Sequence, residues 1–254
     1  MNTLNKIFDK IFVIHCVENK HRYNNILFQK EQNNLDLDIW WTCKHPWSNQ
    51  VVNGLILSNR CARIINGAEF NITREFYTII KTAYIRNFKH ILIFEDDFCL
   101  MKNEYLENFL NVIPNDFDII QFSISANKDI LPNYDFLQEA YKNNKLFMKC
   151  DRGYWCNNGL ALSRKGMKYY IDCIDKEFSA ADVPIFEDTN RIKWYGRTNK
   201  NTGLNHYIPT VPLVYLTVDN PSDAQNIDQS NNYDLYKFID TNYYNIMTYT
   251  NEGN

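Results

Sequence analysis

One short segment restricts the possible folds of this chain more than any other. The apolar run His90-Ile91-Leu92-Ile93-Phe94 leads directly into three carboxylates, Glu95-Asp96-Asp97. Such a run predicts a buried strand, so the carboxylates follow its carboxyl end. Just before it, apolar residues recur at three- and four-residue spacing from Ala68 to Phe88, which predicts an amphipathic helix.

Helices and strands alternate on both sides of this segment. Further strands are predicted at Ile11–Val17, Leu37–Thr42, Asp118–Phe122, Leu146–Cys150 and Gly159–Ser163, with an extended run at Tyr207–Val218. Further helices are predicted at Lys20–Asn33, Asn103–Val112 and Arg164–Ile174. Strands alternating with helices predict an α/β fold with a mainly parallel central sheet and helices on both faces. We expect one domain over residues 1–230 and a helical tail, 231–254, packed on it.

Composition and charge exclude several classes of protein. The net charge is -3, so the basic surface of a nucleic-acid binder is missing. No stretch approaches the ~20 apolar residues of a membrane span, and the run Ile11–Val17 is shorter than a signal sequence needs. The 7 Cys include no CxxC pair, which favours reduced thiols. We expect a cytoplasmic protein, free or peripheral at a membrane.

The acidic cluster suggests a metal site at the edge of the sheet. Like charges this close raise at least one pKa, and a divalent cation with a preference for oxygen, Mg²⁺ or Mn²⁺, removes the repulsion. In an extended chain Glu95 and Asp97 point to one side. These two can face the diphosphate of a nucleotide sugar while Asp96 turns toward neighbouring backbone or the ribose. The alternative is an acidic turn or a helix N-cap, with Asp97 capping a short turn toward Met101. Spacing alone leaves the metal site and this alternative open.

Several segments, taken in order, resemble glycosyltransferase family 25, which contains lipooligosaccharide and collagen glycosyltransferases. The matching segments are IFVIHCVENKHR at 11–22, HILIFEDDFCL at 90–100, DIIQF at 118–122, GLALSRKGMKYYID at 159–172, ADVPIFED at 181–188 and IPTVPLVY at 208–215. The chain departs from the family pattern at His15 and Glu18. It also has Arg74 and Glu75 near the place where the family carries a Ser-His pair. The resemblance implies a GT-A-type, Rossmann-like fold.

The resemblance also implies roles for individual residues. Glu95 and Asp97 would bind the metal ion, with a third ligand from Asp219 or, as second choice, His206, for which a surface loop is the alternative. The family inverts the sugar configuration, which needs a base for the acceptor hydroxyl. The resemblance assigns that base to Asp182, with Glu187 and Asp188 as further candidates.

Other residues are expected around the nucleotide sugar. His15, Cys16 and Val17 end the first strand beneath the base, and Arg22 could reach the diphosphate, although a solvated arginine on a helix face is equally open. The loop of residues 153–159 carries aromatic and amide groups that suit a sugar, unless it is a packed hairpin turn. Its candidates for the nucleotide sugar are Trp155, Asn157 and Asn158, in addition to Asp96.

The function expected from these features is metal-dependent transfer of galactose or glucose from a UDP-sugar. The acceptor would be a glycan, a lipid-linked glycan or a glycosylated protein, and the oligomeric state stays open. The alternatives are a retaining GT-A transferase and a sugar nucleotidyltransferase, although the segment after the first strand, ENKHRYNN, lacks the glycines of a nucleotidyltransferase loop. A non-catalytic carbohydrate-binding protein would be expected to lack the acidic triplet. A hydrolase built on His and Asp ligands is disfavoured because the 5 His show no metal-type spacing.

Overall fold

The computed structural model describes residues 3–57, 61–62, 66–123, 140, 142–150, 157–176, 178–182, 184 and 203–216. Its helices are α1 (Leu4–Ile7), α2 (Lys20–Gln32), α3 (Ser48–Leu57), α4 (Gly67–Ile85), α5 (Asn103–Leu110) and α7 (Arg164–Lys176). Its strands are β1 (Lys10–Cys16), β2 (Leu37–Thr42), β3 (Cys61–Ala62), β4 (His90–Glu95), β5 (Phe98–Leu100), β6 (Ile119–Gln121), β7 (Phe147–Cys150), β8 (Leu160–Ser163), β9 (Phe178–Ser179), β10 (His206–Pro209) and β11 (Val214–Leu216).

A seven-stranded sheet in the order β2-β1-β4-β8-β6-β10-β7 forms the centre of the molecule. β1 pairs in parallel with β2 and β4, and β6 pairs in parallel with β10. β8 is antiparallel to its neighbours β4 and β6, and β7 is antiparallel to β10. The α/β prediction is therefore confirmed, but the sheet is mixed, because β8 and β7 run against the other strands.

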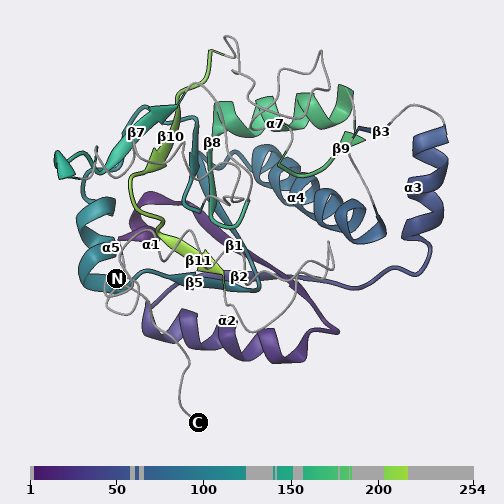
Figure 1. The fold of residues 1–254 in the computed structure, drawn as a ribbon, viewed down its shortest axis with the longest axis horizontal. Helices are drawn as coiled ribbons and strands as arrows, with labels where there is room; N and C mark the ends of the chain where they lie inside the picture. The colour runs from purple at the N-terminus through teal and green to yellow at the C-terminus, as the bar shows by residue number, and fades with distance from the viewer. Residues whose placement is uncertain are drawn as a thin grey trace.

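Alternating side chains of the strands build a core on each face of the sheet. Ile11 and Val13 of β1 join a hydrophobic cluster with α2 and α5, whereas Phe12 and Ile14 join a cluster with α4 and α7. This alternation follows from the two-residue period of a strand. Helices cover both faces, as predicted, with α2 on one side of the sheet and α4 and α7 on the other (Figure 1).

The predicted elements overlap the observed ones, with differences at their ends. Helix α4 begins at Gly67 because the side chain of Asn66 accepts hydrogen bonds from the backbone N–H groups of Ala68 and Glu69, at 2.9 and 3.0 Å. The extended run after Tyr207 is divided between two sheets, because β10 joins the central sheet and β11 pairs with β5. Helices α1 and α3 were not predicted. The tail, 231–254, lies outside the described residues.

None of the helices in the described ranges has both the length and the apolar character that crossing a membrane requires.

Candidate functional site

The acidic residues lie where β4 ends, beside the ends of β1 and β2. Glu95 is the last residue of β4 and pairs with Ile14 of β1, and Cys16 pairs with Thr42 of β2. Because the three strands are parallel, their carboxyl ends meet along one border, which we call the carboxyl edge. Asp96 and Asp97 form the turn that leads to β5, so the acidic turn of the alternative is present. Because a strand follows, Asp97 does not cap a helix.

Asp96 points inward and anchors the turn to β1 and α2. Its carboxylate accepts hydrogen bonds from Nδ1 of His15 at 2.9 Å, from a guanidinium nitrogen of Arg22 at 2.8 Å and from the backbone N–H of Cys16 at 3.3 Å. The side chains of Asp96, His15 and Arg22 are each at least nine-tenths buried. Breaking a buried pair such as Arg22–Asp96 typically costs ~3–5 kcal/mol. These bonds engage both carboxylate oxygens, so the geometry gives Asp96 a structural role.

His15 is a neighbour of this anchor and has little open surface for a ligand. Its ring is 1 % exposed and stacks on Tyr23 with a centroid distance of 5.6 Å. On another side it meets the edge of the half-exposed Trp41 at 5.2 Å. The ring therefore fixes Asp96, and any contact with a nucleotide would come from Trp41 or from backbone.

Asp97 is held by a residue that lies far away in the sequence. Nδ2 of Asn158 donates to Oδ1 of Asp97 at 2.8 Å, while Oδ1 of Asn158 accepts from the backbone N–H of Glu95 at 3.0 Å. One amide thus fixes the carboxylate and the strand end together. Arg22 also lies 3.6 Å from the other oxygen of Asp97, which places a positive charge beside the predicted diphosphate position.

The pKa of Glu95 at this edge is strongly raised. Burial and then the charges of Asp97 and Asp96 raise its pKa to about 8, while Arg22 acts in the opposite direction. The charge of Asp182 contributes to the same increase. The fold therefore brings Asp182 within electrostatic reach of the acidic turn, and Tyr170 of α7 holds this segment by donating to the carbonyl of Ala181 at 2.8 Å.

The described residues fit a divalent cation in part. Glu95 and Asp97 offer carboxylate oxygens, and their mutual repulsion would be relieved by a cation. No group of three or more His, Cys, Asp or Glu side chains with metal-binding geometry occurs among the described residues. Magnesium is usually held by one or two carboxylates plus substrate phosphates, so two carboxylates here would need a phosphate ligand or a further side chain.

The structure does not bring His206 to this site. His206 is the first residue of β10, and the strand register sets it level with Ile91, near the start of β4. Glu95 lies roughly 13 Å further along the strand direction, with two strands in between. His206 is also 4 % exposed, so the surface-loop alternative is wrong. Its buried position in a strand was hidden by the polar residues that precede it in the sequence.

The other residues predicted from the end of β1 are placed at the carboxyl edge. The Cys16 thiol donates to the carboxylate of Glu18 at 3.0 Å, and burial followed by this bond raises the thiol pKa to about 12. Cys16 is therefore protonated and a poor nucleophile. Val17 is 43 % exposed and accessible to a ligand. Trp155, Glu187, Asp188 and Asp219 lie outside the described residues.

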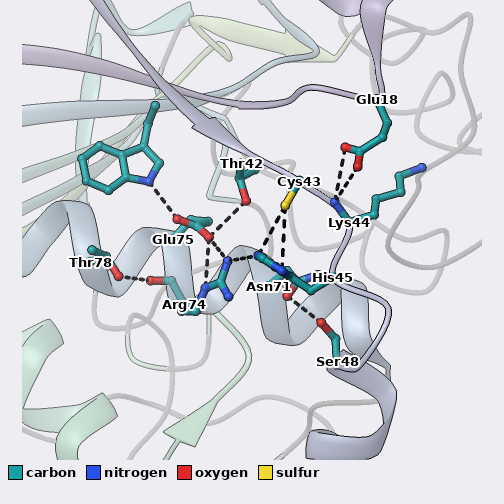
Figure 2. Close-up of polar contacts among 11 residues, drawn as sticks. Glu18, Thr42, Cys43, Lys44, His45, Ser48, Asn71, Arg74, Glu75 and Thr78 are labelled. Carbon is teal, nitrogen blue, oxygen red and sulfur yellow. Dashed lines mark hydrogen bonds and ion pairs between the residues drawn. The ribbon is translucent and has the colours of Figure 1, made fainter.

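A second polar cluster follows β2 at the same edge, and the sequence analysis did not identify it (Figure 2). The buried carboxylate of Glu75, in α4, accepts from Nε1 of Trp40 at 2.8 Å and from the hydroxyl of Thr42 at 3.1 Å, and it forms an ion pair with Arg74. Arg74 donates to Nε2 of His45 at 2.8 Å. The cluster ties β2 to α4 and fixes the arginine. A carboxylate next to the apolar stripe of α4 was the available signal.

A search of protein-family models found no match to this chain, and a search of curated proteins found none either.

Proposed function

We propose that this protein is a metal-dependent, inverting glycosyltransferase with a GT-A-type fold that transfers a hexose from a UDP-sugar. The observation that carries the proposal is the position of Glu95 and Asp97 where β4 ends at the carboxyl edge, with Asp97 fixed by Asn158 at 2.8 Å. The charge of Asp182 also acts on Glu95, whose pKa is raised to about 8. Perturbed carboxylates at such an edge are typical of functional sites. Open α/β sheets bind ligands beyond the carboxyl ends of their strands, which supports this location.

The charges of the site support a diphosphate ligand. Arg22 is fixed by Asp96 at 2.8 Å and lies 3.6 Å from Asp97, so a cation is already oriented beside the acidic turn. Glu95 and Asp97 would hold Mn²⁺ or Mg²⁺. When bound, such an ion would neutralise the charge of the departing diphosphate.

The proposed reaction uses Asp182 as the base. The acceptor hydroxyl oxygen attacks the anomeric carbon on the face opposite the diphosphate and forms the new C–O bond. The bond to the diphosphate breaks, its electron pair leaves with UDP, and the hydroxyl proton passes to the Asp182 carboxylate. Tyr170 donates to the carbonyl of Ala181 at 2.8 Å, which ties the backbone next to Asp182 to α7.

A screen of UDP-, GDP- and CMP-sugars with Mn²⁺, with and without a chelator, tests the activity. We expect release of UDP from one UDP-hexose, with loss of release in chelator and in Asp97→Asn. Asp172→Asn is the matched control, because Asp172 is exposed on α7 and pairs only with Lys168 among the described residues. Equal turnover in chelator would remove the metal assignment, and no turnover with any donor would remove the transferase proposal.

The role of Asp182 has its own test. We expect Asp182→Asn to bind UDP and Mn²⁺ as the wild type does but to transfer sugar ~10²-fold more slowly or worse, as the loss of a general base predicts. Calorimetry measures the binding and single-turnover kinetics measure the transfer. Unchanged transfer would move the role to Glu187 or Asp188.

A further inference from the structure

Two neighbouring asparagines at the carboxyl edge differ in how their amides are used. Both are at least nine-tenths buried, Asn157 at 4 % exposure and Asn158 at 1 %. Both amide atoms of Asn158 are engaged, by Asp97 and by the backbone of Glu95. In contrast, neither the amide oxygen nor the amide nitrogen of Asn157 has a hydrogen-bond partner in the described structure. A buried polar group without a partner costs ~1–3 kcal/mol.

The backbone around Asn157 shows that this segment is firmly positioned. Gly159 donates its N–H to the carbonyl of Ile93 in β4 at 3.1 Å, and its carbonyl accepts from Phe122 at 2.8 Å. Gly159 has a φ of +82°, and a Cβ there would lie 2.8 Å from side-chain atoms of Phe122 and Val214. The segment therefore crosses the edge between β4 and β6 in a conformation that glycine permits. Asn157 directly precedes Asn158, which contacts Glu95 and Asp97 of the acidic turn.

The chemistry of a side-chain amide limits the ligand that Asn157 suits. The amide offers a donor nitrogen and an acceptor oxygen. A phosphate could use only the nitrogen, and a metal ion could use only the oxygen, so each would leave one buried atom unsatisfied. Two adjacent hydroxyl groups satisfy both atoms, because each hydroxyl both donates and accepts.

We propose that Asn157 binds a vicinal pair of hydroxyl groups on the donor sugar and determines which sugar is accepted. Asn158 is a positioning residue that orients Asp97. This assignment rests on the proposed function, since it takes the donor to be a nucleotide sugar. The two residues therefore divide the work: one selects the sugar and the other supports the diphosphate end of the site.

Deoxy donors test the assignment directly. The accepted UDP-hexose and its 2-, 3-, 4- and 6-deoxy analogues are compared by kcat/KM in wild type, Asn157→Ala and Asn157→Ser, while calorimetry gives the affinity for UDP with Mn²⁺. In the wild type we expect loss of one or both of two adjacent hydroxyls to lower kcat/KM about 10- to 100-fold, as one or two lost hydrogen bonds predict. In the variants this discrimination should fall to about threefold or less, with UDP affinity within about twofold of the wild type.

Asn158→Ala is the matched comparison. It should weaken binding of UDP alone and of the UDP-sugar to a similar degree, since it releases Asp97. The assignment of Asn157 is overturned if its variants discriminate among the deoxy donors by kcat/KM as the wild type does. It is also overturned if the variants lower the affinity for UDP as much as the affinity for the UDP-sugar. If the wild type binds no UDP with Mn²⁺, the proposed function itself fails and the sugar assignment fails with it. A wild type that binds UDP-sugar beside variants with an unchanged profile would refute only the role of Asn157.

Discussion

Acid should destabilise this protein through His206, and the structure gives the size of the effect. The ring is buried, neither nitrogen has a partner in the described part of the chain, and burial lowers its pKa from 6.5 to about 3. The unfolded chain therefore binds a proton below pH 6.5 that the folded chain does not bind until pH 3. The stability that depends on neutral His206 is present above pH 6.5 and is lost as the pH falls. Linkage gives a loss of about 2 kcal/mol between pH 7 and pH 5.

Replacing His206 by Leu removes this titration and both unsatisfied nitrogens. The free energy of unfolding is measured with urea and tryptophan fluorescence at pH 7, 6 and 5 for both proteins. His90, whose pKa is also lowered by burial, is present in both, so its effect cancels in the difference. We expect the free energy of unfolding of His206→Leu, relative to that of the wild type, to rise by about 2 kcal/mol as the pH falls from 7 to 5. A difference that stays constant across these pH values would refute a buried, neutral His206.

Three further outcomes follow from single contacts. A Cβ at Gly166 would lie 2.1 Å from the backbone oxygen of Asp118. Gly166→Ala should therefore lower the free energy of unfolding by about 3 kcal/mol. Urea unfolding identical to that of the wild type would contradict this packing. Glu75→Gln weakens the ion pair with Arg74 and should lower the free energy of unfolding by about 2 kcal/mol in the same urea assay. A free energy of unfolding equal to that of the wild type would mean that the fold does not need this ion pair. Because the pKa of Glu95 is about 8, the affinity for Mn²⁺ in the presence of UDP should rise up to about tenfold per pH unit from 6 to 8 and then level off. Calorimetry that finds a flat profile would show that no proton leaves Glu95 on binding.

Local sequence patterns predicted most strands of the central sheet, because a strand buried on both faces of a sheet needs a continuous run of apolar residues. The run Leu37–Thr42 appears as β2 with the predicted bounds, and the helix spacing from Ala68 agrees with α4. Strand direction is a different matter. The residues Leu160–Ser163 do not themselves indicate that this strand lies antiparallel between β4 and β6. Strand direction is set by the connections and by packing of the whole sheet.

The elements that the sequence analysis did not predict were overlooked for identifiable reasons. Helix α3 contains Gly54 and the β-branched pair Val51-Val52, both of which lower helix propensity, so its helical state depends on packing against α4. Strand β5 is short and follows three acidic residues, and it exists because β11 pairs with it from far along the chain. Elements stabilised by distant partners leave little trace in their own sequence.

The carboxylates of the candidate site could be predicted from the sequence, but most of the residues that hold them in place could not. The carboxylates stood out because charge directly after a buried strand is expensive without a partner. The turn of Asp96 toward neighbouring backbone was expected, and its carboxylate accepts from the backbone N–H of Cys16. Sequence alone could not show that Arg22 would pair with Asp96 or that Asn158 would hold Asp97, since both bonds join segments separated by more than 60 residues.

The charges that act on Glu95 add a physical reason for treating the edge as a site. A carboxyl group whose pKa is raised by burial and by three neighbouring acids is retained at a cost in stability, because a neutral residue of similar size would avoid the repulsion. The second cluster at the edge, around Glu75, shows the contrast: there each carboxylate oxygen has donors and the group reads as structural. Glu95, in contrast, has three neighbouring acids that raise its pKa and one arginine, Arg22, that acts against them. A cationic ligand would therefore relieve repulsion at Glu95 that the Glu75 cluster does not have.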